Sequence, residues 1–279
     1  MARRYKFVAG FDGDVLGRLV ARRLGARFIS LKTSRYPAGE SFVTIRGTIS
    51  GRVLLVRNID ADPASAWHVS LAGSALKAAG ARSVSLLAPW IAYGRQDRSG
   101  EAGETLAALL RSAFRRIYTV SPHSRMFTKY FRGRLTSISA HELMADVARR
   151  RKATAVAAPD AGAKGRAKPV ARRLHAPIIV CRKTRTGPGS VRSLGCKGNV
   201  RGARILFVDD MVDSGGTLRA AAEKLKHMGA VSLGACITHA ADPKRIPSAK
   251  NLGLAYLVIL YPRKGKPSSE FLGLLAKSV

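Results

Sequence analysis

The sequence has few acidic residues and no long apolar run. Only 17 of its 279 residues are Asp or Glu, against 49 Lys and Arg, so the formal net charge is +32. A charge of this size predicts a polyanion or a phosphate-rich ligand as partner, and nonspecific binding to polyanions with it. No stretch approaches the roughly 18 apolar residues of a membrane span. The N-terminus, MARRYKFVAGF, also lacks the apolar run of a secretory signal. We therefore expect a cytoplasmic protein.

Cysteine is scarce as well. Cys181, Cys196 and Cys236 show no close-pair spacing. This argues against a disulfide framework and against a four-ligand zinc site. We expect free thiols and a reducing compartment.

Short β-rich apolar runs alternate with amphipathic stretches along the whole chain, and 46% of the residues are hydrophobic. This alternation is typical of α/β folds with mainly parallel sheets and crossover helices. The strands are expected at 6–10, 28–32, 51–59, 83–93, 117–121, 154–158, 177–183, 204–210, 232–238 and 254–260. The helices are expected at 15–24, 64–79, 103–114, 164–174 and 216–228.

Two α/β halves of similar size follow from this pattern. The join is expected at 142–152, where an apolar helix face changes to a basic run. The expected domains are therefore 1–146 and 147–279. The segment 181–204 is rich in glycine, has little periodicity, and is predicted to be a long mobile loop with a functional role.

An acidic cluster stands out in so basic a chain. Asp209, Asp210 and Asp213 lie within five positions at the end of the apolar strand in ILFVDDMVDSGGT. Two glycines in the following turn would let backbone N–H groups and the positive end of a helix dipole surround a phosphate. The first two aspartates would accept hydrogen bonds from sugar hydroxyls. The alternative is an ordinary helix that Ser214 caps. The predicted sugar-phosphate site is Asp209, Asp210, Asp213, Ser214, Gly215, Gly216 and Thr217.

Four further segments end strands with residues suited to phosphate or metal. APWIAYGRQDR offers the planar fork of Arg95, although a solvated loop would look the same. In TVSPH, His123 could bind a metal or be structural. In PDAG, Asp160 directly follows a predicted strand, as in an ordinary helix N-terminus. RKTR places Lys183 and Arg185 at the start of the basic loop, and as cations they could simply belong to that loop.

These segments together resemble known motifs. VDDMVDSGGT resembles the phosphoribosyl diphosphate binding motif of type I phosphoribosyltransferases and of ribose-phosphate pyrophosphokinases. The RQDR segment is similar to one with which the pyrophosphokinases hold ATP and which the transferases lack. RYPAGE, at 35–40, resembles a segment that contacts adenine from a neighbouring subunit in that family. The sequence is therefore similar to the shorter ribose-phosphate pyrophosphokinases over nearly its whole length.

The resemblance implies two phosphoribosyltransferase-like domains, a homo-oligomer, and transfer of a diphosphoryl group from Mg-ATP to the 1-hydroxyl of ribose 5-phosphate. It implies that Lys183 and Arg185 are catalytic and that Mg²⁺ binds at His123 and Asp160. The residues implied for ATP binding are Tyr36, Glu40, Arg95, Gln96, Asp97 and His123.

Three positions depart from the family pattern, because Ala38, Ser121 and Arg182 stand where acidic residues are usual. The changes favour an alternative in which the protein is a catalytically weakened paralogue that binds nucleotide or sugar phosphate and regulates an active synthase. Association with nucleic acid through the surface charge is a further alternative, and a phosphoribosyltransferase is disfavoured because it needs no RQDR segment.

Overall fold

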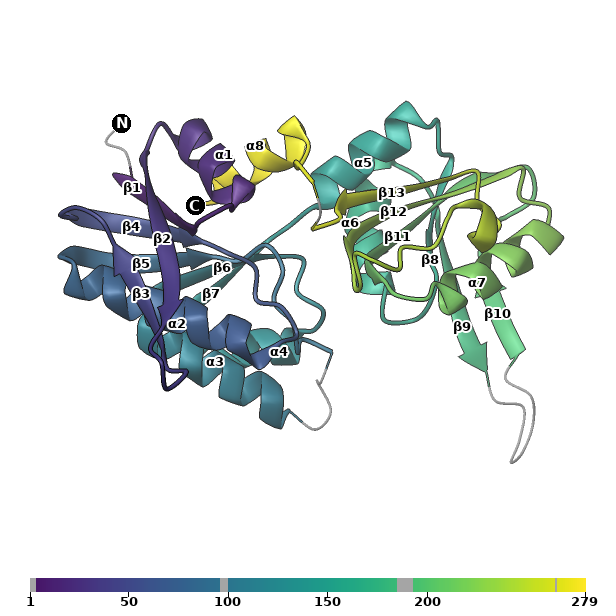
Figure 1. The fold of residues 1–279 in the computed structure, drawn as a ribbon. Helices are drawn as coiled ribbons and strands as arrows, with labels where there is room; N and C mark the ends of the chain where they lie inside the picture. Colours follow the sequence, from purple (N-terminus) through teal and green to yellow (C-terminus); the bar gives the residue numbers. More distant parts are fainter. Residues whose placement is uncertain (1–3, 96–99, 185–192, 264) are drawn as a thin grey trace. The chain divides into compact units, whose positions relative to one another are not determined.

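A computed structural model describes residues 4–95, 100–184, 193–263 and 265–279. The chain divides into two compact units (Figure 1). The first comprises Met1–Ile138 and Lys266–Val279, and the second comprises Ser139–Gly265. Each unit has its own sheet, and each is described by itself.

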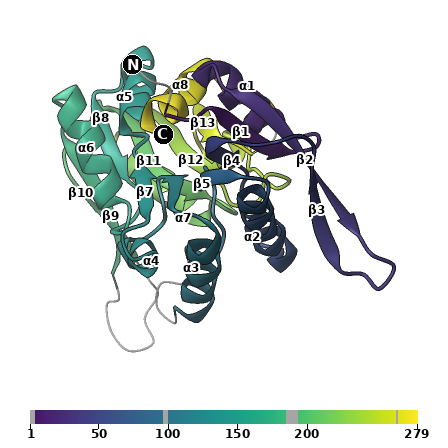
Figure 2. The same cartoon turned by 90° about the vertical axis from the view of Figure 1, so that its left-hand side faces the viewer.

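The sheet of the first unit has the strand order β3-β2-β1-β4-β5-β6-β7. All neighbours pair in parallel except β2 and β3, which form an antiparallel hairpin. Figure 2 shows this hairpin extending outward at one edge of the unit. The strands are β1 (Phe7–Phe11), β2 (Arg27–Arg35), β3 (Ser41–Ile45), β4 (Gly51–Val56), β5 (Ala81–Leu87), β6 (Arg116–Val120) and β7 (Leu135–Ile138).

Helices cover both faces of this sheet (Figure 1). The helices α2 (Pro63–Ala78), α3 (Glu101–Ala113) and α4 (Arg125–Tyr130) lie on one side. The helices α1 (Val15–Leu24) and α8 (Ser269–Ser278) lie on the other. Strand β4 is buried from Val53 to Val56, as expected of a parallel strand with both faces covered.

The sheet of the second unit has the order β10-β9-β8-β11-β12-β13, and only the β9–β10 pair is antiparallel. Its strands are β8 (Ala155–Ala158), β9 (Ile178–Thr184), β10 (Ser193–Lys197), β11 (Arg204–Val212), β12 (Ser232–Ala240) and β13 (Tyr256–Tyr261). Its helices are α5 (His141–Arg150), α6 (Lys164–Leu174), α7 (Gly216–His227) and the short η1 (Lys250–Leu252).

Helix α7 packs on one face of this sheet, where Leu218, Ala221 and Leu225 join the core. Helices α5 and α6 pack against each other and against β8, β11 and β12. Figure 1 shows them on the side of the sheet away from α7. Strand β11 therefore lies in the middle of three layers, and its end carries the acidic cluster.

The two-domain α/β fold with mainly parallel sheets is confirmed, and α1 and α6 have the predicted bounds. The strand predicted at 83–93 is wrong in its second half, because β5 ends at Leu87 and the chain then turns. Pro89 cannot donate a ladder hydrogen bond, and Tyr93 has a positive φ of 66°. The prediction of a loop throughout 181–204 is also wrong, since β9 continues to Thr184 and β10 lies within the segment.

The unit boundaries differ from the expected division at residue 146. Helix α5 belongs wholly to the second unit, since it packs on α6. The C-terminal helix α8 belongs to the first unit, because it contacts α1 and β7 and buries Phe271 and Leu275. Across the described residues, no helix has the length and apolar character needed to span a membrane.

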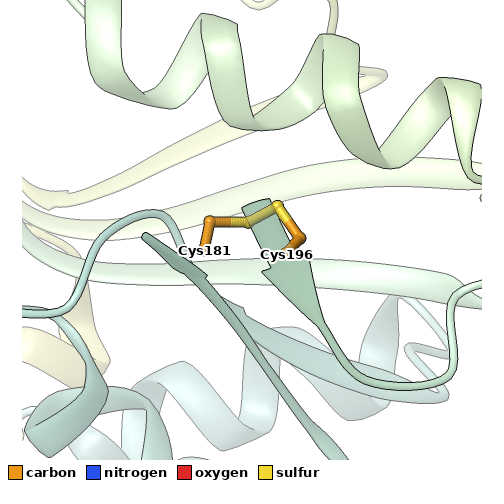
Figure 3. The surroundings of a disulfide bond; sticks show 2 residues. All are labelled: Cys181 and Cys196. Atoms are coloured by element: carbon orange, nitrogen blue, oxygen red, sulfur yellow. A yellow bond between two sulfur atoms is a disulfide. The ribbon is translucent and has the colours of Figure 1, made fainter. Parts of the chain in front are cut away.

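The cysteine prediction is corrected by a disulfide between Cys181 and Cys196 (Figure 3). The two residues lie directly opposite each other in the β9–β10 ladder, with Cα atoms 4.0 Å apart. Cys236 is buried and free. The sequence spacing hid the pair because the antiparallel register of β9 and β10 brings the two residues together. The argument from cysteine for a reducing compartment therefore fails.

Candidate functional site

The candidate residues lie where parallel strands end. In the first unit, Tyr36 follows β2, Arg95 follows the turn after β5, and His123 follows β6. In the second unit, Asp160 follows β8 and Asp213 follows β11. Carboxyl ends of parallel strands share one edge of a sheet, and ligands of open α/β sheets bind at that edge.

The acidic strand end leads directly into a helix. Strand β11 ends at Val212, and the turn through Asp213 and Ser214 reaches the N-cap Gly215 of α7. The N-cap position is occupied by Gly215, which has no side chain, so Ser214 is not at the N-cap position that the alternative reading requires. The first N–H groups of a helix and its positive dipole end are a common place for an anion to bind.

The two glycines of this turn have different roles. Gly215 has a φ of 78°, and a Cβ built on it would lie 2.5 Å from Leu252 Cδ2. The fold itself therefore requires a glycine there. Gly216 has no positive φ, and a Cβ would meet only Ser214 Oγ, at 3.9 Å. Because the protein's own packing leaves this position open, the glycine keeps the backbone accessible to a ligand.

Asp209 and Asp210 form a buried acidic pair with one arginine. The Asp210 side chain is 2% exposed and that of Asp209 17% exposed. Asp209 accepts the backbone N–H of Asp210 at 2.8 Å. Arg166, in the first turn of α6, reaches both carboxylates, at 3.5 Å for Asp209 and 3.2 Å for Asp210. Burial, followed by the charge of Asp210, raises the pKa of Asp209 to about 8, and Arg166 opposes the rise.

Arg166 is the site residue that the sequence did not reveal. Its contacts with β11 join segments that are distant in the chain. One local signal was present, because the first turn of α6 contains Lys164 and Arg166 and no acidic residue. Cations there oppose the helix dipole, so they need a compensating partner.

Asp160 is half-buried between β8 and α6. Its Oδ1 accepts the N–H of Ala163 at 2.9 Å, as in an ordinary turn before a helix. Arg166 donates to the carbonyl of Gly162 in the same turn, at 3.1 Å. The turn therefore connects the PDAG segment to the acidic pair of β11 through one arginine.

Of the RKTR segment at 182–185, the structure describes residues 182–184. The backbone of Lys183 belongs to β9 and pairs with Leu194, two residues beyond the disulfide-bonded Cys181. Arg182 is exposed. Arg185 lies outside the described residues.

In the first unit, the RYPAGE segment at 35–40 forms the tip of the β2–β3 hairpin (Figure 2). Tyr36 donates its N–H to Glu40 and accepts from Gly39 through its carbonyl, at 2.9 and 2.8 Å. The Tyr36 ring is 55% exposed and lies 4.6 Å from the ring of Phe42. Glu40 is also exposed. An exposed aromatic ring that is supported on one side offers the other side for stacking.

The turn after β5 lies close to the segment after β6. A Cβ built on Gly94 would lie 3.7 Å from His123 Cβ, so Arg95 and His123 come from adjoining backbone. Arg95 is exposed and His123 is half-buried. Gln96 and Asp97 lie outside the described residues.

Two non-glycine residues with positive φ flank this region. They are Tyr93, at 66°, and Ser121, at 45°. The hydroxyl of Tyr93 donates to the carbonyl of Ala61, and the N–H of Ser121 donates to Ile138. Such conformations persist where surrounding contacts determine them, and they are frequent at binding sites. Sequence patterns did not reveal them.

No group of three or more His, Cys, Asp or Glu side chains that could hold a metal occurs among the described residues. The two residues predicted for Mg²⁺ belong to different units, His123 to the first and Asp160 to the second. Mg²⁺ commonly takes one or two carboxylates and completes its shell with water and substrate phosphates. Asp160 and the exposed Asp213 have the oxygen chemistry for that mode.

Two family models match consecutive parts of the chain. The N-terminal domain of ribose phosphate pyrophosphokinase matches residues 5–122, and the phosphoribosyl transferase domain matches residues 128–252. The first covers most of the first unit, and the second covers the acidic pair and the α7 turn.

Comparisons with individual proteins agree with the two family models. The chain is 27% identical over 259 residues to the ribose-phosphate pyrophosphokinase 1 of Lactococcus lactis, covering 88% of this chain and 80% of the relative. It is 29% identical over 224 residues to that of Thermococcus kodakarensis, covering 78% and 80%. The phosphoribosylpyrophosphate synthetase of Mycobacterium smegmatis has the same fold, with a TM-score of 0.74, 24% identity, and coverage of 86% of this chain and 84% of that one.

Proposed function

Since the chain belongs to the ribose-phosphate pyrophosphokinase family, a family of diphosphotransferases, we propose that it makes 5-phosphoribosyl 1-diphosphate from Mg-ATP and ribose 5-phosphate. The 1-hydroxyl oxygen of the sugar would form a bond to the β-phosphorus of ATP. The bond from that phosphorus to the oxygen bridging the α-phosphate would break, AMP would leave, and the hydroxyl proton would pass to solvent.

The observation that carries the proposal is the junction of β11 and α7. It combines a buried acidic pair, a helix N-terminus whose N-cap residue is a glycine, and a second glycine that the fold does not itself require. Backbone N–H groups from Ser214 to Thr217 would hold the 5-phosphate. Asp209 and Asp210 would accept hydrogen bonds from the ring hydroxyls, which would orient the 1-hydroxyl.

The first unit would bind ATP. Tyr36 and Glu40 would contact adenine, while Arg95, Gln96, Asp97 and His123 would hold the ribose and phosphates. The support is the exposed Tyr36 ring and the proximity of the Arg95 and His123 segments. Lys183 and Arg185 would neutralise charge on the moving diphosphoryl group, since phosphoryl transfer depends mainly on positioning and electrostatics.

Mg²⁺ would enter with ATP and be held at His123 on the nucleotide side and Asp160 on the sugar side. The ion would neutralise phosphate charge. A site completed by substrate phosphates needs few protein ligands.

We also propose that the protein is a cytoplasmic homo-oligomer and that its net charge of +32 gives it weak, salt-sensitive affinity for polyanions. Size-exclusion chromatography with light scattering tests the oligomeric state. Binding to single-stranded RNA at two salt concentrations tests the last.

The direct test is AMP formation from ATP, Mg²⁺ and ribose 5-phosphate. Lys183→Ala is expected to lower kcat by about 100-fold or more, as loss of one group that stabilises transition-state charge commonly does. Lys197→Ala is the matched control, because Lys197 is an exposed lysine on the neighbouring strand β10. No AMP with any nucleotide, together with ligand binding, would instead support the regulatory paralogue suggested by Ala38, Ser121 and Arg182.

A further inference from the structure

Arg166 connects three parts of the sugar-phosphate edge. One terminal nitrogen of its guanidinium lies 3.5 Å from Asp209 Oδ1 and donates to the Gly162 carbonyl at 3.1 Å. The other lies 3.2 Å from Asp210 Oδ1. The side chain is 19% exposed, so its contacts with the two aspartates are largely shielded from water. A single planar group therefore fixes two adjacent carboxylates and the turn that contains Asp160.

Two neighbouring carboxylates do not take this arrangement unaided. Asp209 and Asp210 are adjacent in sequence, largely buried and of like charge. Like charges in a poorly solvated place repel each other, so without a cation between them the two side chains would rotate apart. That rotation would turn oxygen acceptors away from the sugar side, so the arginine determines how this edge presents them.

The shape of the guanidinium matters as well as its charge. Its two terminal nitrogens address two different side chains while one also reaches a backbone carbonyl. A lysine ammonium is a point charge and cannot reproduce this spread of contacts. A residue that served only as a counter-ion would not need a planar group with two separate terminal nitrogens.

We propose that Arg166 is a positioning residue for ribose 5-phosphate, whose guanidinium fixes the Asp209 and Asp210 carboxylates in the orientation that accepts hydrogen bonds from the sugar hydroxyls. The inference rests on the proposed function, since it concerns the same site. Arg166 acts through the two aspartates and is not itself placed against the substrate.

Calorimetric titration of the full chain with ribose 5-phosphate, in Mg²⁺ and saturating α,β-methylene-ATP, tests this role. Arg166→Ala is expected to raise the Kd for ribose 5-phosphate by about 10- to 100-fold, the usual range for residues that orient ligating groups. The Kd for the ATP analogue should change less than about 3-fold, since the first unit supplies the proposed nucleotide contacts. Arg172→Ala is the matched control, an exposed arginine on the same helix.

Two variants separate positioning from a structural role. Arg166→Lys keeps the charge but not the fork, and it should bind ribose 5-phosphate distinctly more weakly than the wild type. Millimolar guanidinium, far below denaturing concentrations, should partly restore binding to Arg166→Ala and leave Arg172→Ala unchanged. Arg166→Gln serves the same comparison if the alanine variant does not fold.

The outcomes are distinct. Wild-type affinity in Arg166→Lys or Arg166→Gln would overturn the inference while leaving the proposed function intact. Equal weakening for ribose 5-phosphate and the ATP analogue would assign Arg166 to general stability and also overturn it. A wild-type protein that does not bind ribose 5-phosphate would overturn the proposed function, and the inference with it.

Discussion

The two units place their candidate binding residues at the same kind of sheet edge but support them differently. In the second unit, the acidic pair of β11 is buried and held by Arg166 from α6. In the first unit, an ion pair joins Asp14 to Arg57 at 3.8 Å, with the arginine 41% exposed and the aspartate 11% exposed. The side proposed to bind nucleotide instead presents exposed groups on turns and a hairpin, such as Tyr36. A small sugar phosphate suits a rigid buried cradle, whereas a large planar base suits an exposed stacking surface.

The largest expected difference between the units concerns these ion pairs. Asp210→Ala should lower the free energy of unfolding by about 3–5 kcal/mol, because it leaves Arg166 partly buried with one partner fewer. Asp14→Ala should lower the free energy of unfolding by only about 1 kcal/mol, mainly from loss of the N-cap of α1, since the ion pair is 3.8 Å long and its arginine is exposed. Urea denaturation measures both. Equal losses would contradict the contrast between a buried and an exposed edge.

The disulfide gives the second unit a further restraint. Cys196→Ser should lower the free energy of unfolding by about 3 kcal/mol, since the bridge closes a loop with a sequence separation of 15. A reductant should destabilise the wild type by a similar amount and have no effect on Cys196→Ser. Cys236→Ala is the control, because it keeps the bridge and should keep the response to reductant. Two thiols that react with an alkylating agent in the untreated native protein would contradict this account.

The turn before α7 allows a finer test within one site. Gly215→Ala should lower the free energy of unfolding by about 1–2 kcal/mol because of the left-handed backbone. The clash of the added Cβ with Leu252 should lower it further. Gly216→Ala should leave the free energy of unfolding unchanged or raise it by up to about 1 kcal/mol, because alanine is the better helix former and the position is open, yet it should weaken binding of ribose 5-phosphate. Thermal unfolding and calorimetric titration of both variants measure the contrast. Loss of stability in Gly216→Ala with unchanged binding would reverse the assigned roles.

The remaining contrast concerns pH. Burial and the charge of Asp210 raise the pKa of Asp209 in the folded protein to about 8, above the value of about 4 in an unfolded chain. The unfolded state therefore loses this proton first as the pH rises. The stabilisation of the folded state by the protonated Asp209 side chain is fully present below about pH 4 and is lost progressively up to about pH 8. The Tm of Asp209→Asn relative to the wild type should rise across this window, and a constant difference would contradict the raised pKa.

The sequence predicted what depends on local patterns. The bounds of α1 and α6 were correct because their apolar spacing and end signals are contained in the segments themselves. The Asp213–Thr217 turn was found for the same reason. Strand β10 was missed because its five residues, SLGCK, include a glycine and show no clear alternation.

The remaining features depend on contacts between distant segments. The Cys181–Cys196 bridge follows from the register of β9 and β10, and the role of Arg166 follows from the packing of α6 on β11. The positive φ of Ser121 belongs to a backbone position held by Ile138. None of these features has a motif of its own, so only the folded chain reveals them.

The central claim is diphosphoryl transfer to a sugar held at the β11–α7 edge. The most direct measurement supplies ATP labelled at the γ-phosphate, with Mg²⁺ and ribose 5-phosphate, and follows the label. The account predicts label in the sugar product together with unlabelled AMP, and both should fall sharply in Lys183→Ala. Label released as inorganic phosphate with ADP, or no transfer to the sugar under any condition, would contradict it.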